Sequence, residues 1–174
     1  MSKLIIEIRK DLPKTFYKDG GVSILVEEMM KAINESLKYA KDLIQPQLPV
    51  GATGNLQRNL TIEPAVSKYK GRRIEGRLTN KYYSKRYAYV VELGRTAGSK
   101  MPPKGSLIRW IKAKKGLSDK EAKRIEFAVR QKISQNPKSG TFTWARNMNR
   151  INSFTMSSFE KHINTYISRF KGMK

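Results

Sequence analysis

Apolar side chains recur at spacings of three and four from residue 22 to residue 44, which is the longest regular pattern in the chain. This period predicts one long amphipathic helix, ended by Pro46 and Pro49 because proline cannot continue a helix. The apolar stripe consists of Val22, Val26, Met29, Ile33, Leu37, Ala40 and Ile44. The short apolar opening at residues 4–8 favours a strand.

After residue 59 the period changes to two, as expected for strands with one buried face. Apolar and polar residues alternate over residues 60–66 and 74–78, and residues 87–93 form a third run. Short polar segments join the three runs, so the pattern predicts an antiparallel meander. We expect the long helix to cover one face of this sheet.

Three further helices are expected in the second half of the chain. Ser106 is placed to cap a short helix that Gly116 ends. Capping boxes at residues 118–121 and 157–160 are expected to open a helix running to about residue 134 and the last helix. The apolar stripes of these two helices are Ala122, Ile125, Val129 and Ile133, and Phe159, Ile163, Ile167 and Phe170.

These elements predict a single α+β domain over residues 1–174. In it, a long N-terminal helix packs on a small antiparallel sheet and is followed by short helices and a C-terminal helix. We expect the core at about residues 22–134, with a C-terminal arm and helix at residues 135–174.

The charge is large and unevenly distributed. The 174 residues carry 36 Lys and Arg against 14 Asp and Glu, a net charge of +22, of which residues 51–174 hold +21. Such an imbalance indicates a polyanionic partner, an acidic protein neighbour or a solvated basic surface. The candidates for polyanion contact are Arg72, Arg73, Lys85, Arg86, Lys112, Lys114 and Lys115.

Few residues suit catalysis or metal binding. The chain has no cysteine and one histidine, so disulfides and the usual Cys and His metal sites are excluded. We interpret His162 as a surface residue, and Glu63 and Glu75 as cross-strand partners of basic side chains. P-loop, GxSxG and HExxH motifs are absent. The sequence therefore predicts no enzymatic activity, cofactor or metal, and its apolar runs are too short for a membrane span.

Two features point toward nucleic acid. The expected helices at 106–115 and 119–134 have the outline of a helix-turn-helix, but Asn and Gln base readers are nearly missing from the second helix. Contact with the phosphate backbone is therefore favoured over sequence reading. The tyrosines of residues 82–87 are interleaved with basic residues, which suits base stacking, although packing in the sheet is the alternative.

Two Gly- and Pro-containing segments are the candidates for contact between subunits. One surrounds residues 49–56, and the other follows residues 92–95 and contains a proline pair. Loops of ten or more residues in a compact domain are often functional or bind a partner. The residues expected to shape these contacts are Gly51, Thr53, Gly54, Leu56, Glu92, Gly94, Arg95, Pro102 and Pro103.

The order of these segments resembles the tail-completion and head–tail connector (neck) proteins of long-tailed bacteriophages, a family related to the lambda minor tail protein Z group. The resemblance covers residues 22–134. Ala52 stands where the family has an acidic residue, and Arg95 is inserted before Thr96. The segments that carry the resemblance are Pro49 with Thr53, Gly54 and Leu56, then YAYVVELG at 87–94, Pro102–Pro103, and LIRWI at 107–111.

The resemblance implies a structural virion protein without catalysis that forms a homo-oligomeric ring around the DNA channel at the neck. A hexamer is expected, with a dodecamer as the alternative. The ring would complete the tail, contact neighbouring head-connector and tail-terminator proteins, and meet genomic DNA without sequence preference. Assembly in the host cytoplasm is implied, and no membrane contact. The segment at residues 94–105 would be an arm that becomes ordered on a neighbouring subunit.

Two other interpretations stay open. A tail-terminator ring protein is also a small α+β ring former. A nonspecific basic nucleic-acid-binding protein would account for the charge, although not for the Gly- and Pro-containing arm.

Overall fold

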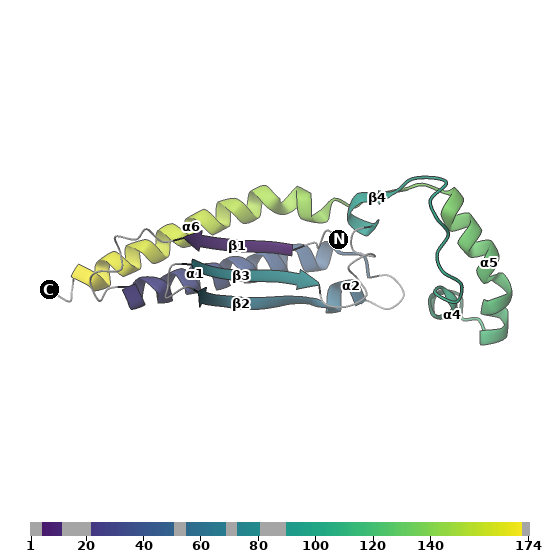
Figure 1. The fold of residues 1–174 in the computed structure, drawn as a ribbon, viewed down its shortest axis with the longest axis horizontal. Coiled ribbons are helices and arrows are strands. Elements are labelled where there is room, and N and C mark those ends of the chain that lie inside the picture. Colours follow the sequence, from purple (N-terminus) through teal and green to yellow (C-terminus); the bar gives the residue numbers. More distant parts are fainter. Residues whose placement is uncertain (1–4, 12–21, 51–54, 69–72, 81–89, 172–174) are drawn as a thin grey trace.

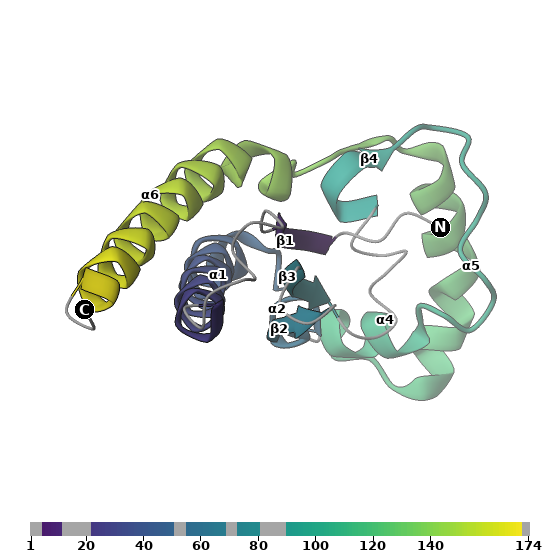
Figure 2. The same ribbon diagram turned by 60° about the vertical axis from the view of Figure 1, so that its left-hand side comes forward.

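A central helix lies between a three-stranded sheet and a second long helix (Figures 1 and 2). This computed structural model describes residues 5–11, 22–50, 55–68, 73–80 and 90–171. The predicted α+β fold, with a long N-terminal helix packed on a small antiparallel sheet, is confirmed. In chain order the elements are β1 (Ile5–Asp11), α1 (Val22–Ile44), η2 (Gln45–Gln47), α2 (Asn55–Arg58), β2 (Leu60–Lys68), β3 (Arg73–Asn80), β4 (Gly94–Arg95), α4 (Ile108–Lys115), α5 (Asp119–Gln135), β5 (Lys138–Ser139) and α6 (Thr143–Lys171).

The main sheet has the order β1-β3-β2, with both pairings antiparallel. The register of β2 against β3 shifts between Glu63 and Val66, which marks a β-bulge. Pro64 lies within this irregularity, on an edge strand, where its missing N–H removes no hydrogen bond from the centre of the sheet.

The third strand is β1, whereas the predicted third strand at residues 87–93 is wrong for its last four residues. Residues 90–93 are helical, and residues 87–89 lie outside the described residues. Val91 and Glu92 are both buried, while Val90 and Leu93 are exposed. Two adjacent buried side chains break the alternation of a strand with one buried face but fit one side of a helical turn. Among the described residues of this run, hydrophobicity therefore indicated burial correctly at Val91 alone, and it indicated the backbone conformation incorrectly.

Helix α1 is buried on the side that faces the sheet, as its predicted stripe requires. Ile33 and Leu37 are fully buried there and lie over Gly76 in β3. A Cβ added to Gly76 would stand 2.9 Å from Ile33 Cγ2 and 2.7 Å from Leu37 Cδ1. The glycine thus lets the helix approach the central strand more closely than any larger residue would permit.

Helix α6 packs antiparallel to α1 and closes the core from the other side (Figure 2). Its early residue Asn147 is hydrogen-bonded to Gln47, just after the end of α1, and its late residue His162 contacts Glu28 near the start of α1. Trp144 and Ile151 of α6 belong to the same hydrophobic core as α1 and the sheet. The core of the molecule therefore extends beyond residue 134.

The predicted start of the last helix at Ser157 is wrong, because α6 begins at Thr143 and is continuous. Ser157 is an exposed residue inside the helix. The predicted apolar face is also displaced, since Ile163 and Ile167 are 37% and 41% exposed. The face that packs on α1 instead includes the polar residues Asn147, Ser158 and His162, which the apolar period could not detect.

The other two helix starts have different outcomes. Ser118 and Glu121 form the predicted capping box at the start of α5. Ser106 does not cap α4, because its hydroxyl donates to the carbonyl of Pro103 and the N-cap position is taken by Leu107 without a side-chain cap. Gly116 ends α4 in the left-handed conformation, as predicted.

Candidate functional site

Residues 94–140 form a lobe that projects from the end of the helix–sheet body (Figure 1). The lobe contains β4, the loop at residues 96–107, α4, α5 and β5. Its two ends pair as β4 and β5, so the chain leaves the body and returns to it through one two-stranded stem. We call residues 94–140 the lobe and the β4–β5 pair the stem.

Glycines allow the backbones of the two chain segments at the stem to approach each other closely. Gly94 has a φ of +82°, and a Cβ at this position would collide with the Lys138 carbonyl and the Gly140 amide. A Cβ on Gly140 would in turn collide with the backbone of Glu92 and Leu93. Gly94, singled out from the sequence as a contact residue, therefore fixes the point at which the lobe leaves the body.

Glu92 anchors the stem to α6. Its Oε1 accepts hydrogen bonds from the first amides of that helix, 2.9 Å from Trp144 N and 3.1 Å from Ala145 N. A carboxylate at this position satisfies unpaired N–H groups and interacts favourably with the helix dipole. The Glu92 backbone carbonyl also accepts from Phe142 N at 3.1 Å. Glu92 is buried, so its side chain is not available for the partner contact that the sequence predicted.

The loop at residues 96–107 lies against α5 instead of extending freely. Gly98 N donates to the Ser134 carbonyl at 2.9 Å, and Arg130 Nε donates to the Pro102 carbonyl at 2.6 Å. At the base of the lobe, Arg95 Nη2 donates to the Asn136 carbonyl at 3.2 Å, just after the end of α5. The predicted arm at residues 94–105 is thus one side of the lobe, and the projecting unit includes both α4 and α5.

The interior of the lobe is small for a segment of this length. Ile111, Ala122 and Glu126 are its buried residues. Large apolar side chains remain on its surface, with Trp110 and Ile125 exposed by 38% and 37% and Phe127 by 63%. Ile125 and Phe127 are two positions apart on α5 and therefore lie on different faces of that helix, so the exposed apolar side chains are distributed over the lobe.

The lobe is strongly basic, and its carboxylates all have internal roles. It contains thirteen Lys and Arg against three Asp and Glu, a net charge of +10. Asp119 bridges the two helices, 3.2 Å from Lys112 Nζ and 2.9 Å from Lys123 Nζ. These lysines and the hydrogen bonds of the capping box lower the pKa values of Asp119 and Glu121, respectively. The buried Glu126 faces the start of α4, with Oε1 3.5 Å from Leu107 N.

The other residues predicted to form the site are dispersed. Leu56 is buried in the core, so the partner contact predicted for it is not available to its side chain. Arg73 begins β3 in the body, whereas Lys112, Lys114 and Lys115 lie together on α4 in the lobe. Pro103 is exposed in the loop of the lobe. The predicted residues Gly51, Thr53, Gly54, Arg72, Lys85 and Arg86 lie outside the described residues.

A group of titratable residues between α1 and α6 was missed by the sequence reasoning, which placed His162 on the surface. His162 is buried, with Nδ1 2.7 Å from Glu28 Oε2 and Nε2 3.2 Å from Glu35 Oε1. Glu28 is also buried, and its Oε1 lies 2.8 Å from Arg169 Nη1 and 3.1 Å from Lys31 Nζ. We call Glu28, Glu35, His162 and their cationic neighbours Lys31, Lys161 and Arg169 the interhelical cluster.

The interhelical cluster favours charged carboxylates. The hydrogen bond with His162, followed by those with its cationic neighbours, lowers the pKa of Glu28 despite burial. Burial raises the pKa of Glu35, but hydrogen bonds from Lys161, His162 and Ser158 outweigh it and lower the pKa overall. Sequence spacing could have placed Ser158 and His162 on the face of α6 that also carries Ile151, but their partners on α1 are more than 120 residues away.

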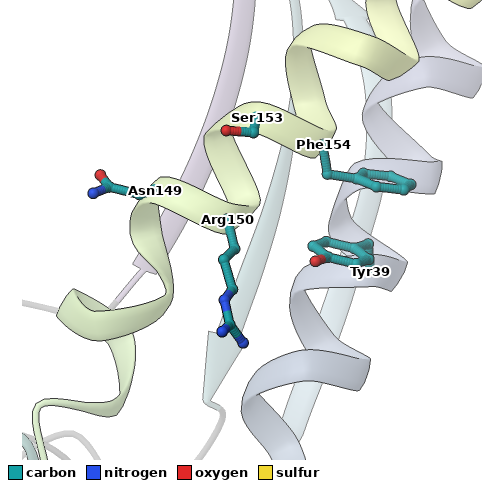
Figure 3. Close-up of a pocket in the computed structure, with 5 residues that line it drawn as sticks. All are labelled: Tyr39, Asn149, Arg150, Ser153 and Phe154. Carbon is teal, nitrogen blue, oxygen red and sulfur yellow. The ribbon is translucent and has the colours of Figure 1, made fainter.

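The remaining features offer little to a small ligand. A shallow hollow between α1 and α6 is lined by Tyr39, Asn149, Arg150, Ser153 and Phe154 (Figure 3). Two of these residues, Tyr39 of α1 and Phe154 of α6, stack on each other with ring centroids 4.1 Å apart. Among the described residues, no group of acidic and histidine side chains could hold a metal ion. Within the same part of the chain, no helix is long and apolar enough to cross a membrane.

Comparisons with family models, with characterised proteins and with solved structures find no match to this chain.

Proposed function

We propose that the chain is a structural subunit of a long-tailed bacteriophage, forming a homo-oligomeric ring at the neck that completes the tail and joins it to the head. The family resemblance of residues 22–134 suggests this role. The observation that carries the proposal is the lobe. It projects from the body on a stem, and only three of its residues, Ile111, Ala122 and Glu126, are buried. In a ring, such a lobe lies on the neighbouring subunit, and the receiving surface repeats around the symmetry axis.

The ring that we propose is a hexamer, or alternatively a dodecamer. Contacts between subunits and with head-connector and tail-terminator proteins would cover part of the lobe, including the exposed side chain of Trp110 on α4.

The family pattern supports the same proposal through its local geometry. The Glu–x–Gly of residues 92–94 is the part of the pattern that attaches the lobe, because Glu92 holds the first turn of α6 and Gly94 permits the close crossing of the stem. These residues set the angle at which the lobe leaves the body. Ring assembly depends on that angle, since a small error per subunit prevents closure.

The proposal is tested by removing the lobe without disturbing the body. Arg95 and Lys138 are paired across the stem, so residues 96–137 can be replaced by Asn-Gly, a two-residue turn that closes an antiparallel hairpin. The mass of both proteins is then measured by light scattering in about 0.5 M salt, which screens repulsion between basic subunits. We expect the full chain to form a ring of defined mass, or to join purified tails, and the lobe-deleted chain to do neither.

The control is the fold of the lobe-deleted protein, which should keep the circular dichroism and cooperative unfolding of the α1–α6 body. A folded, lobe-deleted protein that assembles like the full chain would contradict the proposal.

A nonspecific nucleic-acid-binding protein is the second candidate, and the net charge of +10 on the lobe favours it. In that case the full chain stays a monomer or dimer at every salt concentration. A tail-terminator ring would also assemble through the lobe, but it would bind the end of the tail tube and leave the head connector unbound.

A further inference from the structure

We propose that the outer face of α5 is a nucleic-acid-binding surface that contacts phosphates without sequence preference. Lys120, Arg124, Phe127 and Gln131 follow one another at spacings of four, three and four, so they share one face of the helix. All four are exposed. The opposite face of α5 contains Ala122 and Glu126, its two buried residues.

Among the described residues, no carboxylate is paired with the cations of this face. Asp119 is occupied by Lys112 and Lys123, Glu121 by the capping box, and Glu126 is buried. Within the described part of the chain, Lys120 and Arg124 therefore have no acidic side chain to pair with. Burying Lys120 and Arg124 at an interface removes their hydration. This cost is offset only if the partner supplies anions that pair with them.

A polyanion fits this face better than a second copy of the chain. Each copy carries a net charge of +22, so a neighbouring subunit opposes the approach of more positive charge. A nucleic-acid strand presents one phosphate per nucleotide and releases condensed counterions when lysine and arginine replace them. Lys120 and Arg124 are one turn apart on α5, so each can meet a phosphate of the same strand.

Phe127 adds a second kind of contact. Its side chain is 63% exposed and has Lys123 and Arg124 one turn before it and Arg130 and Gln131 one turn after it. An aromatic ring among cations can stack with an unpaired base while the cations hold the adjacent phosphates. This arrangement favours single strands over duplexes, in which the bases are already stacked.

The nucleic-acid surface and the proposed ring can be tested separately, because the surface is one face of α5, and the stem, the loop at residues 96–107 and α4 remain for contact between subunits. Lys120→Gln combined with Arg124→Gln leaves the stem and the interior of the lobe unchanged. If the chain does not assemble, the binding face can still be tested on the monomer, and if the face does not bind nucleic acid, the ring can still form.

The experiment measures fluorescence anisotropy of labelled random-sequence oligonucleotides, single-stranded and duplex, over a range of salt concentrations. The full chain is compared with Lys120→Gln/Arg124→Gln and with a matched control, Lys38→Gln/Arg146→Gln, which removes the same charge from exposed positions on α1 and α6. We expect the α5 variant to bind about tenfold more weakly at about 0.1 M salt, with a salt slope reduced by about 1.4–1.8, and the control to change by less than about twofold.

Phe127→Ala tests the stacking contact separately. We expect about a tenfold loss of affinity for the single strand and little change for the duplex, since base stacking on an aromatic side chain is worth about 1–3 kcal/mol. Unchanged binding to the single strand would contradict the stacking role.

Two results would overturn the proposal as a whole. One is an equal loss of affinity in the α5 variant and the α1/α6 control, which would indicate diffuse attraction by the net charge. The other is binding of polyglutamate as tight as that of nucleic acid and equally sensitive to the α5 substitutions, which would indicate an acidic protein as the partner.

Discussion

Gly94 and Gly98 have almost the same backbone conformation in very different surroundings. Their φ angles are +82° and +74°. A Cβ at position 94 would collide with the backbone of the opposite stem strand, whereas a Cβ at position 98 would have no atom within 4 Å. The two positions therefore separate the conformational cost of a left-handed residue from the steric cost of a crowded crossing.

We predict that Gly94→Ala is more destabilising than Gly98→Ala. Gly98→Ala should cost about 1–2 kcal/mol, the usual cost of a left-handed non-glycine residue, confined to the loop. Gly94→Ala adds a collision that forces the stem apart, and we expect a total of about 3 kcal/mol. The amides of Thr141 and Phe142 donate to the carbonyls of Val91 and Glu92 next to the stem, so their hydrogen exchange measures this separation. Equal exchange in both variants would contradict the role assigned to Gly94.

The interhelical cluster makes the free energy of unfolding depend on pH in the acidic range. The pKa of Glu28 is lowered from its ordinary value of 4.5, mainly by the hydrogen bond with His162. A carboxyl whose pKa is lower in the folded state contributes stability that is fully present above 4.5 and is lost as pH falls through the folded value. Glu35, whose pKa is also lowered, acts in the same direction.

We predict that Glu28→Gln reduces the free energy of unfolding by about 1–3 kcal/mol at pH values above about 5. The cost is below that of a fully buried pair because solvent screens the half-exposed Lys31 and Arg169. The difference from the unmodified chain should shrink as pH falls below about 4.5. Urea denaturation at several pH values measures this. Glu160→Gln, at an exposed position on α6, is the control, and a constant difference across the range would contradict the prediction.

At the scale of elements, local signals predicted what local interactions determine. The period of α1, the capping box of α5 and the left-handed glycine after α4 involve residues within a few positions of one another, and the structure contains all three. The start of α6 was not predictable in this way, because its first amides are capped by Glu92, about fifty residues earlier. The prediction of a strand at residues 87–93 was wrong over residues 90–93 for a related reason, since hydrophobicity indicated burial at Val91 without indicating a helical turn.

The candidate site was predictable to a similar extent. Glycine, proline and charge patterns identified residues 92–103 as a special segment, but they could not show that α4 and α5 project with it on one stem. The sequence showed that α5 is basic, but it could not show that Phe127 is exposed. That exposure depends on which face of α5 packs on the interior of the lobe, and this face contains Ala122 and Glu126. The buried polar face of α6 was hidden because its partners are on α1.

The two capping-box sequences provide a prediction at this scale. Ser118→Ala should cost about 1 kcal/mol in the stability of α5, because the hydroxyl accepts from Glu121 N at the start of the helix. Ser157→Ala should change stability by less than about 0.5 kcal/mol and in the stabilising direction, because alanine has a higher helix propensity at an exposed interior position. Thermal unfolding and amide exchange distinguish the two sites, and a comparable loss at Ser157 would mean that a helix starts there.

At the scale of the whole molecule, burial is concentrated in the body. The fully buried apolar residues of α1, β3 and α6 belong to one core, while the lobe buries Ile111 and Ala122 around a carboxylate. A helix of 8 residues, such as α4, is marginal in water by itself, and most helical stability in proteins comes from tertiary packing. The lobe therefore depends on its stem, on the bonds between its loop and α5, and on whatever it binds.

We predict that the lobe opens far more often than the body in the isolated chain. Amides of α4 and α5 should exchange with solvent at least about a hundredfold faster than those of α1 and β3, whose exchange requires global unfolding. Assembly or nucleic-acid binding should slow exchange in the lobe and leave the body unchanged, because a ligand that contacts the folded lobe shifts its opening equilibrium by its own binding free energy. Hydrogen exchange followed by mass spectrometry on proteolytic fragments resolves the two regions. Protection of the lobe equal to that of α1 before any partner is added would show that the lobe is stable by itself, and its sparse interior would then need a different explanation.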